Sequence, residues 1–189
     1  MEFRDVFRRV SEILDLATIP YMLTGSFASS YYGVLRATHD IDIVISPAPQ
    51  NVKTLVQRLN EKDYYADLNA AIDAQRTQSM FNALDNQTGW KVDFIFCKSS
   101  AYAREAFQRR RAVDFHQTRI FVASVEDVIV SKLEWARMGE STRQIEDVAA
   151  VFKKQHASVD RSYIEKWVAE LGLTSEWSRA RQLAGLEQT

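Results

Sequence analysis

The segment from Asp40 to Ile45 constrains the fold most, because Ile41, Ile43 and Ile45 alternate with Asp40, Asp42 and Val44. Ile41, Ile43 and Ile45 fall on one side of the alternation, and Asp40 and Asp42 fall on the other. A period of two is that of a β-strand, in which residues i and i+2 project from the same face roughly 6.5 to 7 Å apart. The isoleucines therefore predict a core face, and two carboxylates point together away from it.

Two like charges on one structured face need compensation, either from a hard divalent cation with oxygen ligands or from a basic side chain. A third carboxylate, Asp93, lies in the middle of the apolar segment 91–96. If that segment is the neighbouring strand, Asp93 joins Asp40 and Asp42, and three such carboxylates can hold two Mg²⁺ ions. The alternatives are a solvated strand end or an ion pair with Arg36 for the first two, and a carboxylate paired within the fold for Asp93.

A glycine turn precedes this strand. Gly25 and Ser26 separate a short apolar strand at 21–23 from a helical segment at 27–32. A glycine lets the backbone approach a phosphate closely, and a helix N-terminus offers free N–H groups. The alternative is an ordinary strand-to-helix turn in which Ser26 caps the helix.

Lys132 falls inside the apolar stripe of the helix predicted after Ser124. A lysine on an inward face needs an anion, unless its long stem carries the charge out to solvent. We expect it to neutralise a triphosphate or the carboxylate cluster.

Periodicity predicts an α/β (α+β) fold, a short mixed sheet flanked by helices and followed by a C-terminal helical region. A catalytic core is expected over residues 1–98, and a mostly helical region over 99–189 completes the cleft as part of one continuous unit. Helices are expected at 2–17, 52–59, 124–138, 142–155, 160–171 and 174–184, a hairpin at 80–84 and 90–96, and a strand at 118–122.

The total charge does not point to a nucleic-acid or membrane partner. The 189 residues include 24 Lys+Arg and 25 Asp+Glu, a net charge of -1. The single cysteine, Cys97, cannot form an intramolecular disulfide, and with the three scattered histidines it makes no plausible zinc site. We expect a soluble, unprocessed, cytoplasmic protein, since the sequence shows neither an apolar signal segment nor a membrane span.

Several motifs together resemble the signature of the polymerase β nucleotidyltransferase superfamily, over roughly residues 20 to 150. The Arg-x-Thr-x-Asp-x-Asp form resembles the AbiEii-like toxin nucleotidyltransferases, but two positions depart from that group. Thr24-Gly25 stands where the family often has two adjacent glycines, and Glu146-Asp147 stands where Lys-Asp is expected, which leaves the role of Asp147 open. The matching segments are Leu23-Thr24-Gly25-Ser26, Arg36-Ala37-Thr38-His39-Asp40-Ile41-Asp42, Val92-Asp93, and more loosely 125–133 and 143–147.

This resemblance implies a minimal nucleotidyltransferase fold and an attack of an acceptor hydroxyl on the α-phosphorus of a nucleoside triphosphate such as ATP, with release of pyrophosphate. It implies that Asp40 and Asp42 bind both Mg²⁺ ions and that Asp93 binds the catalytic one. The triphosphate would be bound by Gly25, Ser26, Arg36 and Lys132.

The resemblance also favours RNA, such as a tRNA end, as the acceptor, and a toxin role with a separately encoded antitoxin. Arg109, Arg110 and Arg111 could then contact RNA phosphates, although such a run is also typical of a solvated helix end. A small-molecule nucleotidyltransferase of the antibiotic-modifying kind is a second hypothesis. A catalytically silent nucleotide-binding or interaction module is a third.

Overall fold

The strand predicted from Asp40 to Ile45 forms at the centre of a seven-stranded mixed sheet with the order β3-β4-β5-β2-β1-β7-β6. The computed structural model describes residues 3–34, 38–115 and 118–186. Strands β2 and β5 pair in parallel, as do β1 and β7, and the other pairs are antiparallel. The strands are β1 (Tyr21–Leu23), β2 (Asp40–Ile45), β3 (Tyr64–Ala66), β4 (Met80–Asp85), β5 (Lys91–Phe96), β6 (Arg111–Phe115) and β7 (Thr118–Val122).

Contacts divide the chain into two units, one of residues 1–24 and 37–122 and the other of residues 25–36 and 123–189. The first unit holds the whole sheet. The sequence predicts a change from a catalytic core to a mostly helical region near residue 98. The contacts instead place the β6–β7 hairpin in the unit of the sheet, because β7 pairs with β1. Strand β6 was not predicted from the sequence. The helices of this unit are α1 (Phe3–Leu16), α3 (Asn51–Glu61), α4 (Leu68–Thr77) and α5 (Ala101–Gln108).

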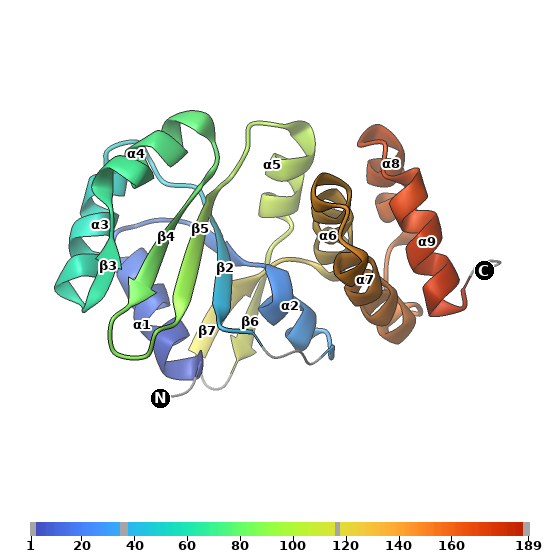
Figure 1. The fold of residues 1–189 in the computed structure, drawn as a ribbon, viewed down its shortest axis with the longest axis horizontal. Helices are drawn as coiled ribbons and strands as arrows, with labels where there is room; N and C mark the ends of the chain where they lie inside the picture. The colour runs from blue at the N-terminus through green and yellow to red at the C-terminus, as the bar shows by residue number, and fades with distance from the viewer. Residues whose placement is uncertain (1–2, 35–37, 116–117, 187–189) are drawn as a thin grey trace. The chain divides into compact units, whose positions relative to one another are not determined.

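The isoleucine face of β2 is the core face, as the alternation predicts. All three of its isoleucines are fully buried. Helix α1 covers this face, since Arg9 forms an ion pair with the buried Asp85 of β4 and the Tyr64 hydroxyl of β3 donates to the Val6 carbonyl. In Figure 1 strands β4, β5 and β2 accordingly lie in front of α1. The face that carries the carboxylates is the other one.

Helix α4 was not predicted, although its first turn carries a capping signal. Asp67 stands at the N-cap, and its side chain accepts a 2.6 Å hydrogen bond from the Ala70 amide. Such a cap satisfies one of the free amides of the first turn. The helix ends at Gln78, which adopts a left-handed conformation with φ 51°. The helix returns the chain from β3 to its antiparallel neighbour β4.

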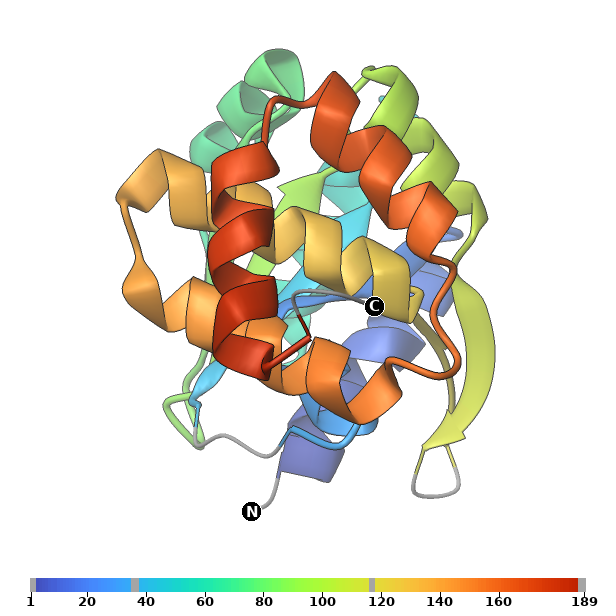
Figure 2. The same ribbon diagram turned by 90° about the vertical axis from the view of Figure 1, so that its right-hand side faces the viewer.

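The second unit is helical, and its predicted helices are confirmed. It consists of α2 (Gly25–Tyr31), α6 (Val125–Gly139), α7 (Thr142–Gln155), α8 (Arg161–Glu170) and α9 (Thr174–Ala184). Figure 2 views this group, with α9 in red packed beside α7. In the described part of the chain, no helix is long and apolar enough to cross a membrane.

Buried polar groups join the N-termini of α6 and α8. Asp127 accepts hydrogen bonds from the Tyr163 hydroxyl at 2.7 Å and from the Ser124 hydroxyl at 2.6 Å. Glu126 accepts from the Asp160 amide at 3.0 Å. The Ser124 hydroxyl also accepts from the Asp127 amide, so Ser124 caps the helix that was predicted after it. These buried carboxylates have a structural role.

Candidate active site

The pairing register of β2 and β5 brings four charged side chains onto one face of the sheet. Asp40 lies opposite Lys91, and Asp42 lies opposite Asp93. Residues opposite one another in a sheet point to the same side. The register therefore puts Asp40, Asp42 and Asp93 on one face of two neighbouring strands, and their role as a metal site stays a prediction.

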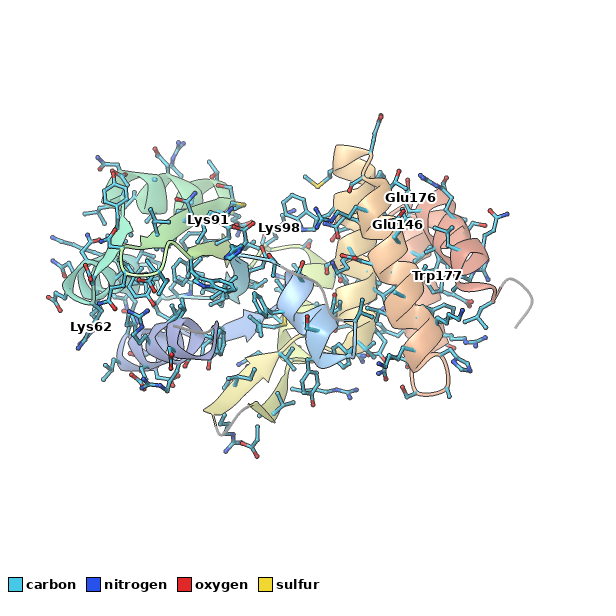
Figure 3. The ribbon with its side chains drawn as sticks, turned by 60° about the horizontal axis from the view of Figure 1, so that its bottom comes forward. Lys62, Lys91, Lys98, Glu146, Glu176 and Trp177 are labelled. Carbon is cyan, nitrogen blue, oxygen red and sulfur yellow. The ribbon has the colours of Figure 1, made fainter. Side chains whose placement is uncertain are left out.

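Lys91 completes this group and was not among the predicted site residues. Its Nζ lies 2.9 Å from Oδ2 of Asp93 and 3.5 Å from Oδ1 of Asp40. The hydrogen bond to Asp93 raises the pKa of Lys91 above its ordinary value, although burial opposes this shift. Figure 3 labels Lys91 among the side chains of the first unit. Its position two residues before Asp93 already placed it on the carboxylate face by the same period of two.

The carboxylates differ in their exposure to solvent. The Asp40 side chain is 52% exposed, whereas that of Asp93 is 7% exposed. Oδ1 of Asp93 is buried and has no hydrogen-bond partner among the described residues. A buried carboxylate oxygen without a donor or a cation is costly, so this atom is suited to receive a ligand.

The chemistry of these side chains fits a hard divalent ion such as Mg²⁺, which prefers carboxylate oxygens. Asp42 and Asp93 face each other, and Oδ1 of Asp93 is available. As the described residues are arranged, however, no three acidic, histidine or cysteine side chains are placed to hold a metal ion together. The Lys91 ammonium is the cation between Asp40 and Asp93 here.

Thr24, the residue before the glycine turn, belongs to the first unit and pairs with β2. The Thr24 amide donates a 2.9 Å hydrogen bond to the Asp42 carbonyl, and the next residue is Gly25. Gly25 has φ 64°, in the left-handed region that a side chain disfavours. Helix α2 begins at Gly25, so Ser26 lies inside its first turn and is not its cap. Gly25 and Ser26 belong to the second unit, and their contact with phosphate stays a prediction.

Lys132 occupies the inward position that was predicted for it in the second unit. Its side chain is 4% exposed, which rules out the alternative in which its stem reaches solvent. Its Nζ lies 2.8 Å from Oδ2 of Asp147 and donates to Oε1 of Gln144 at 3.2 Å. The anion that Lys132 needs is thus supplied within the fold. Asp147, whose role the sequence left open, is its partner.

The other basic residues predicted to bind phosphates are Arg36 and the run at 109–111. Arg36 lies outside the described residues. Arg110 is engaged in its own unit, where its guanidinium lies over the rings of Phe107 and Phe121 and donates to the Phe107 carbonyl at 2.7 Å. The run at 109–111 is therefore not a set of three solvated arginines.

Solved structures of nucleotidyltransferases resemble this fold. The antibiotic-resistance factor ANT(2'')-Ia matches with a TM-score of 0.62 and 14% identity, over 94% of each chain. The lincosamide antibiotic adenylyltransferase LnuA matches with a TM-score of 0.55 and 12% identity, over 80% of this chain and 96% of LnuA. An antigenic nucleotidyltransferase-like protein from Paracoccidioides brasiliensis matches with a TM-score of 0.54 and 15% identity, over 91% and 88% of the two chains.

No family model matches this sequence, and no curated protein matches it. At these identities the likeness to solved structures establishes the fold alone. The chain thus has the mixed α/β fold of known nucleotidyltransferases, and the predicted fold class is confirmed. The AbiEii-like subgroup stays a prediction.

Proposed function

We propose that this protein is a Mg²⁺-dependent nucleotidyltransferase that transfers a nucleoside monophosphate from a nucleoside triphosphate to a hydroxyl group of a small molecule. One observation carries the proposal. Asp42 and Asp93 lie opposite each other, with Asp40 on the same face, in a sheet whose fold is that of nucleotidyltransferases.

The three carboxylates have distinct roles in this proposal. Asp40 and Asp42 would hold two Mg²⁺ ions, and Asp93 would share one of them; such ions would supply positive charge to the triphosphate during the in-line displacement. The acceptor hydroxyl donates its proton toward Asp93, and its oxygen forms a bond to the α-phosphorus. The bond from that phosphorus to pyrophosphate breaks, and pyrophosphate leaves with the electron pair.

Gly25 and Ser26 would bind the β- and γ-phosphates through their backbone, since Gly25 has the conformation that a close backbone approach requires. Arg36 and Lys132 are the proposed counter-charges of the triphosphate. To reach a phosphate, Lys132 would have to exchange its contact with Asp147 for one with the nucleotide.

The surface beside Asp93 supports a small acceptor. Asn82 of β4 lies next to Asp93 in the register, and Leu84 lies next to Tyr65 of β3. Leu84 and Tyr65 are 43% and 65% exposed, and Met80 at the other end of β4 is 39% exposed. Two strand spacings, about 10 Å, separate Tyr65 from Lys91, with which it is in register, and Asp93 lies two residues further along β5. That span suits a molecule of a few rings whose apolar side lies on β4 and β3.

The charge of this surface argues against RNA. On the exposed side of β2, β3, β4 and β5, all of whose residues are described, Lys91 is the single basic residue beside three aspartates. RNA affinity depends largely on lysines and arginines that neutralise phosphates. An RNA acceptor, a tRNA end and a cognate antitoxin therefore stay predictions from the sequence.

Two structural neighbours support the choice of a small molecule. ANT(2'')-Ia has been crystallised in complex with adenylyl-2''-tobramycin, and LnuA with lincomycin bound. Both are antibiotic-modifying proteins, which favours the second hypothesis drawn from the sequence over an RNA-directed toxin.

The proposal is tested by incubating the protein with Mg²⁺, each labelled nucleoside triphosphate and a panel of aminoglycosides and lincosamides, beside total tRNA. Label on a small molecule that is lost in Asp42→Asn is the expected result. Label on tRNA that depends on Asp42 would establish RNA as the acceptor instead. Binding of a triphosphate without any Asp42-dependent transfer would identify a silent nucleotide-binding module and overturn the proposal.

A further inference from the structure

Lys91 joins the two strands of the carboxylate site through ion pairs with both of them. Its Nζ contacts Oδ2 of Asp93 on its own strand at 2.9 Å and Oδ1 of Asp40 on β2 at 3.5 Å. The Asp93 carboxylate is almost fully buried, so its charge is poorly solvated and depends on a nearby cation. Lys91 supplies that charge.

The ammonium and a divalent ion would compete for the same oxygens. A Mg²⁺ ion binds carboxylate oxygens at about 2.0 to 2.1 Å, so an ion on Oδ2 of Asp93 would enter the space that the ammonium occupies. Two cations held on one carboxylate also repel each other strongly in a partly buried site. An ion on Oδ2 therefore excludes the present position of Lys91, and an ion on the available Oδ1 is disfavoured by the nearby ammonium.

Lys91 is able to leave without disturbing the core. It is the first residue of β5, and its side chain is 40% exposed. A lysine carries its charge on a flexible four-carbon stem that can turn toward solvent. The alternating pattern of β5 keeps Val92 and Phe94 buried on the other face, so the strand stays anchored when Lys91 moves.

We propose that Lys91 is a resident counter-ion, which holds Asp40 and Asp93 together before a divalent ion binds and sets the affinity for that ion because it must be displaced. This inference rests on the metal site of the proposed function. It does not depend on which acceptor is used or on whether transfer occurs.

The test compares Lys91→Met with Lys98→Met. Lys98 is an exposed lysine two residues past the end of β5, so its removal changes the net charge equally without touching the carboxylates. Binding of Mn²⁺ to each full-length protein is measured by calorimetry, without nucleotide or acceptor. We expect Lys91→Met to bind Mn²⁺ roughly tenfold more tightly than the unmodified protein, the change expected when a competing charge is removed. Lys98→Met should match the unmodified protein.

A second readout uses stability without metal. Lys91→Met should melt at a lower temperature than Lys98→Met, because its carboxylates repel each other, and Mn²⁺ should raise its melting temperature by the larger amount. Lys91→Arg keeps the charge and should bind Mn²⁺ no more tightly than the unmodified protein.

Equal Mn²⁺ affinities in Lys91→Met and Lys98→Met, weaker binding in Lys91→Met, or no Mn²⁺ binding by any variant would each overturn the inference. These outcomes are separate from the transfer assay. An active enzyme in which Lys91→Met leaves Mn²⁺ affinity unchanged refutes the role of Lys91 alone. Tighter Mn²⁺ binding in a protein that transfers nothing supports the role of Lys91 and refutes the proposed reaction.

Discussion

Asp42 of β2 and Asp93 of β5 lie directly opposite each other across two parallel strands. Like charges in opposed positions of a sheet destabilise it. The fold thus holds two like charges at opposed positions, and Lys91 beside Asp93 compensates part of that charge. Such a conflict between stability and charge is typical of a site built for a ligand.

The Asp42→Asn variant should lose activity and gain stability. Removing one of the two charges relieves the repulsion with Asp93, which should raise the free energy of unfolding without metal by about 0.5 kcal/mol. Transfer should fall roughly 100-fold or more, because a metal ligand is lost. Chemical denaturation and the transfer assay measure the two effects. Asp73→Asn, at an exposed carboxylate of α4, should leave activity unchanged. A loss of stability in Asp42→Asn would contradict this explanation.

Removing only one charge of the buried Lys132–Asp147 ion pair should lower the free energy of unfolding. Lys132→Met leaves the Asp147 carboxylate without its ammonium and should lower the free energy of unfolding by about 3 kcal/mol. The double variant Lys132→Met with Asp147→Leu removes both charges and should recover most of that loss. The neighbouring exposed Glu146 provides a control, since Glu146→Gln should change stability by less than about 0.5 kcal/mol. A double variant no more stable than Lys132→Met would contradict the pairing.

A side chain at Gly25 should strain the glycine turn. At φ 64° an alanine is strained, so Gly25→Ala should lower the free energy of unfolding by about 1 to 2 kcal/mol and reduce transfer. Gly139 is the matched control, because it ends α6 without a positive φ and has open space around its Cα. Gly139→Ala should be neutral or stabilising by about 0.5 kcal/mol. Equal effects at the two glycines would show that the turn does not require Gly25.

Tyr65 should affect binding of the acceptor and not the chemical step. Its ring is 65% exposed on β3, two strands from Asp93. Tyr65→Ala should raise the KM for the acceptor about tenfold with little change in kcat, since an apolar contact common to ground and transition states is lost. Ile72→Ala, at a comparably exposed apolar side chain of α4, should leave both constants unchanged. A fall in kcat alone would contradict the proposed acceptor surface.

Stability should fall at alkaline pH through two buried tyrosines. Burial raises the pKa of both Tyr21 and Tyr64 from 10.0 to about 12. Between these values the unfolded chain loses the phenolic protons and the folded chain keeps them, so rising pH favours unfolding. Denaturation at a series of pH values, with tyrosinate absorbance as a second signal, measures this. Tyr64→Phe should weaken the dependence, and an unchanged dependence would show that Tyr64 does not cause it.

Strong periodicity made most of the fold predictable. The alternation of β2, the hairpin of β4 and β5, and the last four helices follow directly from apolar spacing. Helix α4 was not predicted because its segment carries few large apolar residues, although Asp67 is a residue type typical of a helix N-cap. Strand β6 was not predicted because it is short and lies at the edge of the sheet. An edge strand does not need one fully apolar face, so its sequence lacks a clear alternation.

The candidate site was partly predictable for a similar reason. The period of two placed Asp40 and Asp42 together, and an acidic residue within an apolar strand singled out Asp93. Lys91 obeyed the same period but was not recognised, because an exposed lysine at a strand end is common. The pairing of Lys132 with Asp147 depends on how α7 packs against α6, which local sequence does not determine.

The chain passes between its two units after residues 24, 36 and 122, so helix α2 is separated in sequence from α6, its packing partner. During synthesis, the ribosome releases α2 nearly a hundred residues before α6 exists. The Tyr32 hydroxyl donates to the Ala123 carbonyl, so this hydrogen bond forms only after residue 123 has been synthesised. A nascent chain that ends after residue 122 would therefore contain α2 without its packing partner α6. We expect chaperones to bind α2 in such a chain.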